Sequence, residues 1–407
     1  MKILLSAFAC RPNSGSETGV GWRWAIELAK QHNVVVLTDV TRKVDIEAEL
    51  ATISTKSLKF EYYRTTWLKW VPLNSKTAQL LYSAWQYSLL PFALQLHRKH
   101  QFDLIIHLTY GVFRHPSFLG FVGAPFVFGP VGGGEDAPWR LKRSLPFSVK
   151  VKEFIRWQMN HIASWNPFLW LALSKADCIF VRTPETAKLL PMFARSRAIQ
   201  YQEIGIDLPA KLGKVKRRDL TQPLSLLFVG RLLGLKGVHL AIRALSQVVA
   251  NGVDVRLTIV GTGSIKAFLD SVAASVGIQE RTDWIEHVPQ EQLLQKYAEF
   301  DAFLFPSLHD SGGNVVLEAM AGGLPIICLD IGGPATLVNV DCAMVISTDH
   351  ADEAVVVSRL ADAITMLATN EEKRMLMSTA ALKCVREMSW ESRVSGALGI
   401  IKSRLIK

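Results

Sequence analysis

The sequence has few cysteines, and their spacing does not suggest a disulfide framework. Among its 407 residues are five cysteines, none in a CxxC arrangement: Cys10, Cys178, Cys328, Cys342 and Cys384. Several lie inside apolar runs, where a thiol behaves as a small hydrophobic side chain. The sequence therefore predicts buried thiols in a reducing compartment, as in a cytoplasmic protein.

The sequence also lacks a secretory signal and any convincing membrane span. Only Lys2 precedes the short apolar run that ends at Cys10, and Arg11 follows at once, so we interpret this run as a first strand. Two long stretches without acidic residues, lysine or arginine, residues 77–96 and 157–174, are each broken by polar residues and a proline. Neither predicts a helix that crosses a bilayer.

Acidic residues are in the minority, since 46 lysines and arginines face 36 aspartates and glutamates, a net charge of +10. Nucleic acid and an anionic membrane surface are the partner classes that such a charge favours. No RNA- or DNA-binding motif is visible, and the basic residues are not interleaved with aromatic residues in a recognisable pattern. We therefore expect no nucleic-acid partner.

A membrane surface fits the distribution of charge and tryptophan better. Between residues 140 and 156 only Glu153 is acidic, whereas the cations are Arg140, Lys142, Arg143, Lys150, Lys152 and Arg156. Large apolar residues follow directly: Trp157, Trp165, Phe168, Leu169 and Trp170. Basic residues beside tryptophan-rich surface are typical of a peripheral helix on anionic lipid. The alternative is that the aromatic residues pack a domain core and the cations form a solvated face.

Strand-like and helix-like segments alternate through both halves of the chain, which is typical of parallel sheets covered by helices. The expected strands of the first half are residues 3–9, 34–38, 104–108, 126–128 and 178–181. Those of the second half are residues 226–229, 256–260, 302–305 and 326–329. With 49% apolar residues, the chain is long enough for two domains with separate cores.

The most informative segment is residues 305–330, FPSLHDSGGNVVLEAMAGGLPIICLD, which reads as a strand, a glycine loop, a short helix and a second strand. Two carboxylates, Asp310 and Glu318, lie eight positions apart across the loop. The loop has no bulky side chain and leads into a helix that begins near Val315. Backbone N–H groups at such a helix start can bind an anion.

Two further loops follow predicted strands. The run Leu226 to Val229 is followed by Gly230 and Arg231, and Lys236 comes five residues after Arg231. Near the N-terminus, residues 12–19 (PNSGSETG) break the first strand before a helix with apolar residues at helical spacing. A glycine turn after the first strand is where doubly wound sheets bind ligands.

Taken singly, these features have ordinary explanations. A glycine loop before a helix is common in α/β proteins, and Lys236 alone fits a solvated surface lysine. Asp310 and Glu318 could be a helix cap and a solvated helix face. Their order and spacing along one chain favour a shared function.

Together the three segments resemble those of retaining glycosyltransferases of family 4 (glycosyl transferases group 1), whose donor signature has two acidic residues separated by seven. The resemblance implies the α/β GT-B fold, in which two Rossmann-like domains face each other across a cleft. Residues 1–205 would form the acceptor-side domain and residues 206–387 the donor-binding domain. Residues 388–407, beginning Met-Ser-Trp-Glu, would cross back as a helix onto the first domain.

The resemblance also implies roles for single residues. In the family, the residues matching Arg231 and Lys236 clamp the diphosphate of the sugar nucleotide and stabilise it as it leaves. The residue matching Glu318 accepts hydrogen bonds from the ribose hydroxyls. Asp310 stands where the family usually has glutamate, so a shorter side chain would make the sugar contact. Further donor contacts would come from Gly15, Ser16, Gly230, Gly312, Gly313, Asn314 and Val315.

Many family members have a histidine after the fourth strand of the first domain that contacts the donor sugar. Here His107 is the candidate for this catalytic position, although the usual doubled-histidine spacing is absent. The alternative for His107 is a hydrogen-bonded core histidine, and His115 is the second choice for the sugar contact. The glycine run at residues 131–136 would be a flexible loop at the acceptor.

The implied reaction moves a sugar from a nucleotide-sugar donor to a hydroxyl acceptor with retention, the leaving phosphate oxygen taking the acceptor proton. The chain has no Asp-x-Asp pair, so no metal and no other cofactor are expected. The basic aromatic region favours a lipid-linked sugar or a growing surface polysaccharide as acceptor. It also favours a peripheral position on the inner face of a membrane.

Two other classes of function stay open. A phosphorylase or sugar-nucleotide epimerase could use the same fold, and a phosphorolytic enzyme would consume free phosphate. A non-catalytic nucleotide-sugar-binding protein would bind nucleotide without turnover.

Overall fold

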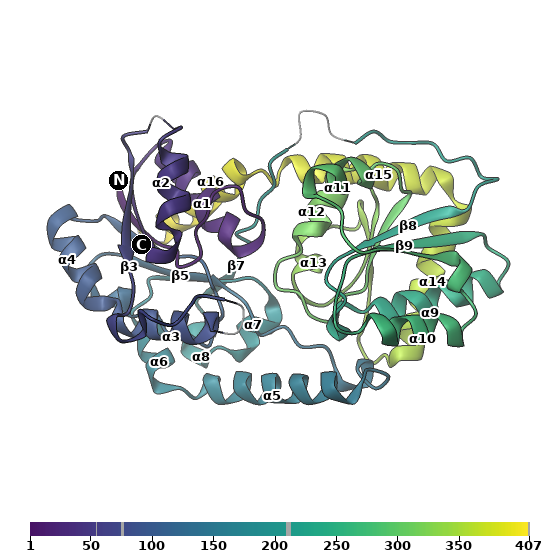
Figure 1. Ribbon diagram of the computed structural model, residues 1–407, viewed down its shortest axis with the longest axis horizontal. Helices are drawn as coiled ribbons and strands as arrows, with labels where there is room; N and C mark the ends of the chain where they lie inside the picture. The colour runs from purple at the N-terminus through teal and green to yellow at the C-terminus, as the bar shows by residue number, and fades with distance from the viewer. Residues whose placement is uncertain (54, 75–76, 209–212, 406–407) are drawn as a thin grey trace. The chain divides into compact units, whose positions relative to one another are not determined.

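The computed structural model describes residues 1–53, 55–74, 77–208 and 213–405, which form two compact units (Figure 1). The first unit comprises Met1–Gly134, Gln158–Gly205 and Trp390–Lys407. The second comprises Glu135–Trp157 and Ile206–Ser389. Glu135–Trp157 fall inside the range predicted for the first domain, yet they pack with the second unit.

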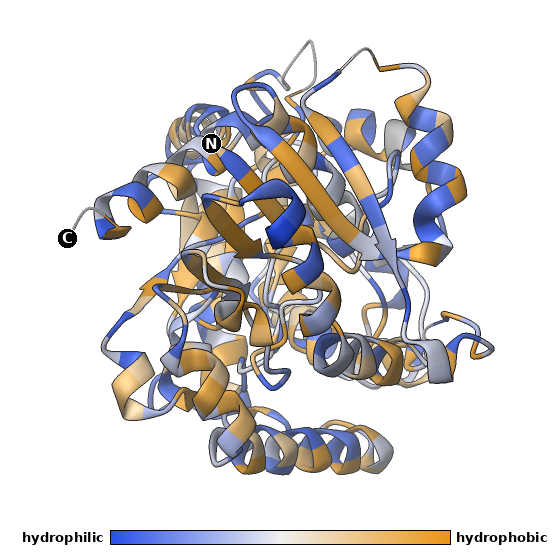
Figure 2. Ribbon diagram, turned by 90° about the vertical axis from the view of Figure 1, so that its left-hand side faces the viewer, coloured by the Kyte–Doolittle hydropathy of each residue, from blue (hydrophilic) through white to orange (hydrophobic). Residues whose placement is uncertain are grey.

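The first unit is built on a parallel sheet of seven strands in the order β3-β2-β1-β4-β5-β6-β7. The strands are β1 (Lys2–Ser6), β2 (Asn33–Asp39), β3 (Leu58–Tyr63), β4 (Leu104–His107), β5 (Phe126–Val131), β6 (Cys178–Val181) and β7 (Ala198–Gln200). The strands between the edges are almost wholly apolar because helices cover both faces of such a sheet. Figure 2 shows this as orange strands.

The helices of the first unit connect these strands and return from the chain's end. They are α1 (Ser16–Ala29), α2 (Lys43–Leu50), α3 (Ala78–Ser88), α4 (Leu90–His100), α6 (Pro167–Ser174), α7 (Pro184–Leu189), α8 (Met192–Arg195) and α16 (Trp390–Leu405). Helix α5 (Phe147–Ser164) contains the boundary between the two units. Helix α16 packs beside α1, and Tyr201 donates a hydrogen bond to the carbonyl of Arg393 in α16.

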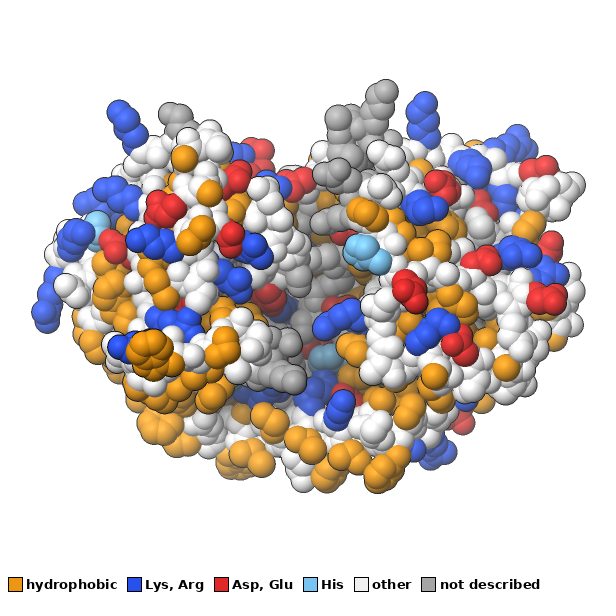
Figure 3. Space-filling model, viewed as in Figure 1, with side chains coloured by type: hydrophobic (Ala, Val, Ile, Leu, Met, Phe, Trp, Pro, Cys, Tyr) orange, Lys and Arg blue, Asp and Glu red, His pale blue; other side chains and the backbone are white. Residues whose placement is uncertain are grey.

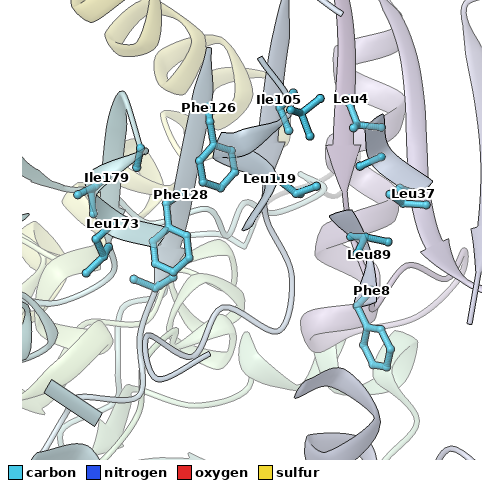
Figure 4. Close-up of a cluster of buried hydrophobic side chains, with 14 of the residues drawn as sticks. Leu4, Phe8, Leu37, Leu89, Ile105, Leu119, Phe126, Phe128, Leu173 and Ile179 are labelled. Carbon is cyan, nitrogen blue, oxygen red and sulfur yellow. The ribbon is translucent and has the colours of Figure 1, made fainter. Parts of the chain in front are cut away.

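The core of the first unit lies against one face of its sheet (Figure 4). Phe126 and Phe128 on β5 are fully buried, with Ile105 on β4 and Ile179 on β6 beside them. Successive residues of a strand point to opposite faces, so positions two apart share a face. This alternation explains why Phe126 and Phe128 pack into the same cluster.

The second unit repeats the architecture with a parallel sheet of six strands in the order β10-β9-β8-β11-β12-β13. Its strands are β8 (Leu224–Val229), β9 (Val255–Val260), β10 (Thr282–Ile285), β11 (Ala302–Phe305), β12 (Ile326–Leu329) and β13 (Ala343–Ile346). Its helices are α9 (Val238–Ala250), α10 (Lys266–Ser275), α11 (Gln290–Tyr297), α12 (Asn314–Ala321), α13 (Gly332–Leu337), α14 (Glu353–Thr369) and α15 (Glu371–Arg386). Two parallel-sheet α/β units are the fold class that the sequence predicts.

Candidate functional site

Nine of the twelve predicted site residues lie in the second unit, in the segments that follow the carboxyl ends of β8 and β11. They are Gly230, Arg231, Lys236, Asp310, Gly312, Gly313, Asn314, Val315 and Glu318. β8 and β11 are hydrogen-bonded neighbours in the sheet. In a parallel sheet the carboxyl ends of adjacent strands meet at one edge, which is where α/β proteins bind ligands.

The loop after β8 presents the two predicted clamp cations differently. Gly230 has a φ of +158°, and Arg231 follows it with an exposed side chain. Lys236 ends the short 3₁₀ helix η5 (Gly234–Lys236), and its side chain is half-buried. Arg231 is thus open to solvent, whereas Lys236 is held against the rest of the site.

A close backbone approach joins this loop to the loop after β11. Gly237 has a φ of +69°, and a Cβ at this position would lie 1.8 Å from the carbonyl oxygen of Pro306. The carbonyl of Leu235 accepts hydrogen bonds from the N–H groups of Leu308 and His309, at 2.8 and 3.2 Å. Only glycine satisfies both the positive φ and the lack of space at position 237.

This approach brings Lys236 and Asp310 into an ion pair of 2.5 Å between Nζ and Oδ2. The other carboxylate oxygen of Asp310 accepts the N–H of Gly312 at 3.2 Å. The backbone carbonyl of Asp310 accepts the N–H of Gly333 at 2.7 Å. Lys236 and Asp310, two of the three predicted catalytic residues in these loops, are therefore fixed in one arrangement.

The start of α12 forms a second polar element of the site. Gly313 adopts a φ of +109° immediately before the helix, which begins at Asn314. The first N–H groups of a helix have no acceptor inside it, and the helix dipole adds partial positive charge there. The N–H groups of Asn314 and Val315 are thus suited to bind a phosphate or a sugar oxygen.

Glu318 lies one turn into α12 and is held by a residue that the sequence did not single out. The buried Tyr297 hydroxyl donates to Oε2 of Glu318 at 3.0 Å. Burial, reinforced by the nearby carboxylate, holds the pKa of Tyr297 well above its usual range. The tyrosine therefore stays a donor and fixes the carboxylate. Nothing in the sequence marks Tyr297, because it ends a separate helix.

Glu135 is the second residue whose place the sequence did not predict. Its side chain is fully buried in the second unit, where Oε2 accepts the Ser311 hydroxyl at 2.6 Å. Its backbone carbonyl accepts Nδ1–H of His309 at 2.7 Å and a guanidinium N–H of Arg156 at 3.1 Å. Burial, followed by the charge of Arg156, lowers the pKa of His309. Glu135 thus contacts the donor-signature loop, and the acceptor role predicted for residues 131–136 stays a prediction.

The other three predicted site residues lie in the first unit. Gly15 is exposed in the loop after β1, and Ser16 is the first residue of α1. The loop is closed by a hydrogen bond of 3.0 Å from the N–H of Arg11 to the carbonyl of Thr18. The expected turn between the first strand and helix is present, and the donor contacts assigned to it stay predictions.

His107 ends β4 and is 1% exposed. Its Nε2 is hydrogen-bonded to the Tyr82 hydroxyl at 3.1 Å, its Nδ1 to the side-chain amide of Gln86 at 3.3 Å, and its ring stacks on Phe128. Burial lowers the pKa of His107 to about 3. These contacts favour the core-histidine alternative over a sugar contact.

His115, the second choice, also has both ring nitrogens hydrogen-bonded, to Ser83 and to Gln79 at 2.9 Å each. Burial lowers its pKa to about 4. Within the described residues, no group of three or more histidine, cysteine or acidic side chains is arranged to hold a metal ion. Metal independence stays a prediction.

Comparison with known proteins identifies relatives of part of the chain. Residues 214–383 match the family model of glycosyl transferases group 1. A D-inositol 3-phosphate glycosyltransferase of Corynebacterium aurimucosum is 28% identical over 184 residues, which are 43% of this chain and 42% of that protein. The amylovoran biosynthesis glycosyltransferase AmsK of Erwinia amylovora is 32% identical over 158 residues, 37% of this chain and 39% of that protein. The matched stretch spans less than half the length of each of these relatives.

Solved structures resemble the whole chain at low sequence identity. Sucrose-phosphate synthase from Thermosynechococcus elongatus has a TM-score of 0.66 at 16% identity, covering 100% of this chain and 99% of that chain. The Anabaena protein HepE, solved in complex with UDP, has a TM-score of 0.61 at 16% identity, with 99% of each chain covered. The chain therefore has the GT-B fold that the sequence predicts.

Proposed function

We propose that the chain is a retaining glycosyltransferase of family 4. Its residues 214–383 match the family model of glycosyl transferases group 1. It moves a sugar from a nucleotide-sugar donor to a hydroxyl acceptor. The observation that carries the proposal is the arrangement in the second unit, where Lys236 contacts Asp310 beside the start of α12. Arg231 lies in the same loop after β8 that leads to Lys236.

This arrangement suits the chemistry of sugar transfer from a diphosphate. Breaking the glycosyl–phosphate bond adds negative charge to the departing diphosphate, and fixed donors aimed at developing charge give the largest catalytic effect. Arg231, Lys236 and the N–H groups at the start of α12 supply such donors. In a front-face reaction the leaving phosphate oxygen takes the acceptor proton, and the new bond forms on the side from which the diphosphate departs.

The donor is a sugar nucleotide whose ribose is bound by Glu318. The Tyr297 hydroxyl fixes one oxygen of this carboxylate, which supports a role as a hydrogen-bond acceptor of set orientation. HepE was solved with UDP, so UDP-sugars are the first donors to test.

The proposed acceptor is a lipid-linked sugar or a growing surface polysaccharide. Such an acceptor places the enzyme in the cytoplasm, at the inner face of a membrane. The supporting observations are the net charge of +10 and the aromatic, basic stretch between residues 139 and 175.

The test follows the fate of the donor. Purified protein is incubated with UDP-sugars and lipid extract, with and without a chelator, and the nucleotide products are separated. We expect nucleoside diphosphate to be released, unaffected by the chelator, and release to fall by about two orders of magnitude in Lys236→Ala. Phosphate-dependent formation of sugar 1-phosphate would show a phosphorylase instead. Bound nucleotide without product would show a binding protein, and loss of turnover in chelator would overturn metal independence.

A further inference from the structure

Helix α5 is amphipathic, but it presents its apolar side to solvent, whereas a helix that covers a protein core turns its apolar side inward. Six of its apolar side chains face solvent, with exposed fractions from 39% for Val151 to 78% for Phe147. The exposed stripe consists of Phe147, Val151, Phe154, Ile155, Met159 and Ile162, which recur at helical spacing. Figure 3 shows hydrophobic side chains gathered on the surface over α5.

The polar side of α5 is the side turned inward. Glu153 is buried and lies in an ion-pair cluster with Arg156 and Lys142, whose side chain is fully buried. Asn160 is also buried and donates to the carbonyl of Gly133 at 2.9 Å. Since the helix satisfies its polar groups inside the protein, its apolar stripe is not a misplaced core face.

Helix α6 extends this apolar surface within the first unit. Its exposed members, with the residue before the helix, are Trp165, Phe168, Trp170 and Leu171. The Trp170 indole donates to the carbonyl of Ser164 at 2.7 Å, and the Trp165 and Trp170 rings lie 6.5 Å apart. Phe168 meets Tyr87 of α3 edge to face. We call the exposed apolar residues of α5 together with these four the α5–α6 surface.

Within residues 137–176, which contain the α5–α6 surface, the exposed charged side chains are all basic. Glu153 is the sole acidic residue between positions 137 and 176, and it is buried. The exposed cations in this range are Arg143, Lys152 and Lys175, and Lys150 is half-buried. Two of the six cations that the sequence assigned to a membrane-facing side, Lys142 and Arg156, are instead engaged in internal ion pairs.

We infer that the α5–α6 surface docks on an anionic phospholipid bilayer, with α5 lying in the plane of the interface. An 18-residue helix is about 27 Å long, and an apolar stripe with tryptophans and cations beside it suits the headgroup boundary. In the described part of the chain, no helix has both the length and the apolar character to cross a membrane. The inference deepens the proposed function, on which it rests for the membrane-bound nature of the acceptor.

The test is flotation of the full-length protein with vesicles of phosphatidylcholine, alone or mixed with phosphatidylglycerol. The double variant Trp165→Ser, Phe168→Ser removes two exposed apolar anchors, and Val340→Ser is the control because Val340 is 86% exposed in the second unit. We expect binding to mixed vesicles and weaker binding to neutral ones. The double variant should lower the partition coefficient by about tenfold or more, and the control should not change it.

Unchanged flotation of the double variant, or no binding to either vesicle, would overturn the inference. A concentration-dependent dimer that the double variant abolishes would assign the surface to a second copy of the chain instead. Nucleoside diphosphate binding, measured without vesicles, reports on the donor site alone. If the protein binds nucleoside diphosphate but does not float with vesicles, membrane docking is overturned and the proposed transferase function stands.

Discussion

At the scale of single residues, Arg231 and Lys236 carry the same charge in different surroundings. Arg231 is exposed after β8, and Lys236 is half-buried in its pair with Asp310. Removing an exposed side chain leaves no buried partner unpaired, so Arg231 is the residue whose truncation reports on ligand binding with least effect on folding.

We expect Arg231→Ala to weaken nucleoside diphosphate binding by about 10- to 100-fold, which corresponds to losing a charge-assisted hydrogen bond of roughly 1.5–3 kcal/mol. The melting temperature without ligand should stay the same. Isothermal titration measures the affinity, and Arg256→Ala on β9, an exposed arginine, is the charge-matched control. Equal weakening in both variants would mean that net charge, and not the clamp, sets the affinity.

His107 provides the pH-dependence prediction. Burial lowers its pKa to about 3, whereas an unfolded chain titrates histidine near 6.5. Between these values the unfolded state binds the proton and the folded state does not, so stability falls as the pH drops below about 6.5. The contribution of His107 at pH 5 is a loss of about 2 kcal/mol relative to neutral pH.

The variant His107→Gln keeps an amide donor and acceptor but cannot titrate. We expect its free energy of unfolding to fall less than that of the wild type between about pH 7 and 5, as urea titrations would show, and donor turnover to persist at neutral pH. A loss of turnover of two orders of magnitude in a folded variant would restore the sugar-contact role of His107.

At the scale of elements, the sequence predicts the interior strands and misses the edges. All nine expected strands occur, and the four that were not predicted, β3, β7, β10 and β13, are the edge strands of the two sheets. Interior strands are covered on both faces and read as continuous apolar runs. The edge strands are partly exposed. LKFEYY of β3 and TDWI of β10 lack a continuous apolar run, whereas AMVI of β13 is wholly apolar and was missed nonetheless.

The contact between the loops after β8 and β11 leads to a prediction about Gly237. Substituting alanine requires a positive φ and space that the Pro306 carbonyl occupies, so we expect a loss of about 3 kcal/mol or more in stability. Gly252→Ala is the matched control, because Gly252 also has a positive φ but nothing lies within 4 Å of its Cβ position. The control should lose about 1 kcal/mol. Equal losses, measured by urea unfolding, would contradict a tight loop contact.

The buried contact of Glu135 with Ser311 makes the donor loop depend on a segment far away in sequence. We expect Glu135→Gln to raise the KM for the donor about tenfold with little change in kcat, because the carboxylate positions the loop and touches no reacting atom. Ser311→Ala should have the same effect, and the double variant should be no worse than either single one. Additive losses in KM would show that the two residues act independently.

At the scale of the whole molecule, the chain crosses between its two units several times, and the excursion of Glu135–Trp157 is the crossing that the sequence does not reveal. Glu135–Trp157 pack with the second unit although the residues on both sides belong to the first. From the sequence, residues 140–170 were recognised as basic and aromatic, but the apolar stripe of α5 and the side of it that faces solvent were not, because periodicity defines a stripe and not its partner. The local motifs of the donor site were predictable for the opposite reason, since each lies within one strand–loop–helix unit.

The central claim is that the second unit binds a nucleotide-sugar donor through Arg231 and Glu318. The most direct test is a thermal-shift screen of the wild type, Arg231→Ala and Glu318→Ala with UDP, GDP, ADP, CDP and dTDP. A ligand present at 100 times its Kd stabilises a protein by about 2.7 kcal/mol. We predict a rise in melting temperature with one of these nucleotides that disappears in both variants. No rise with any nucleotide, or a rise that both variants keep, would contradict the account.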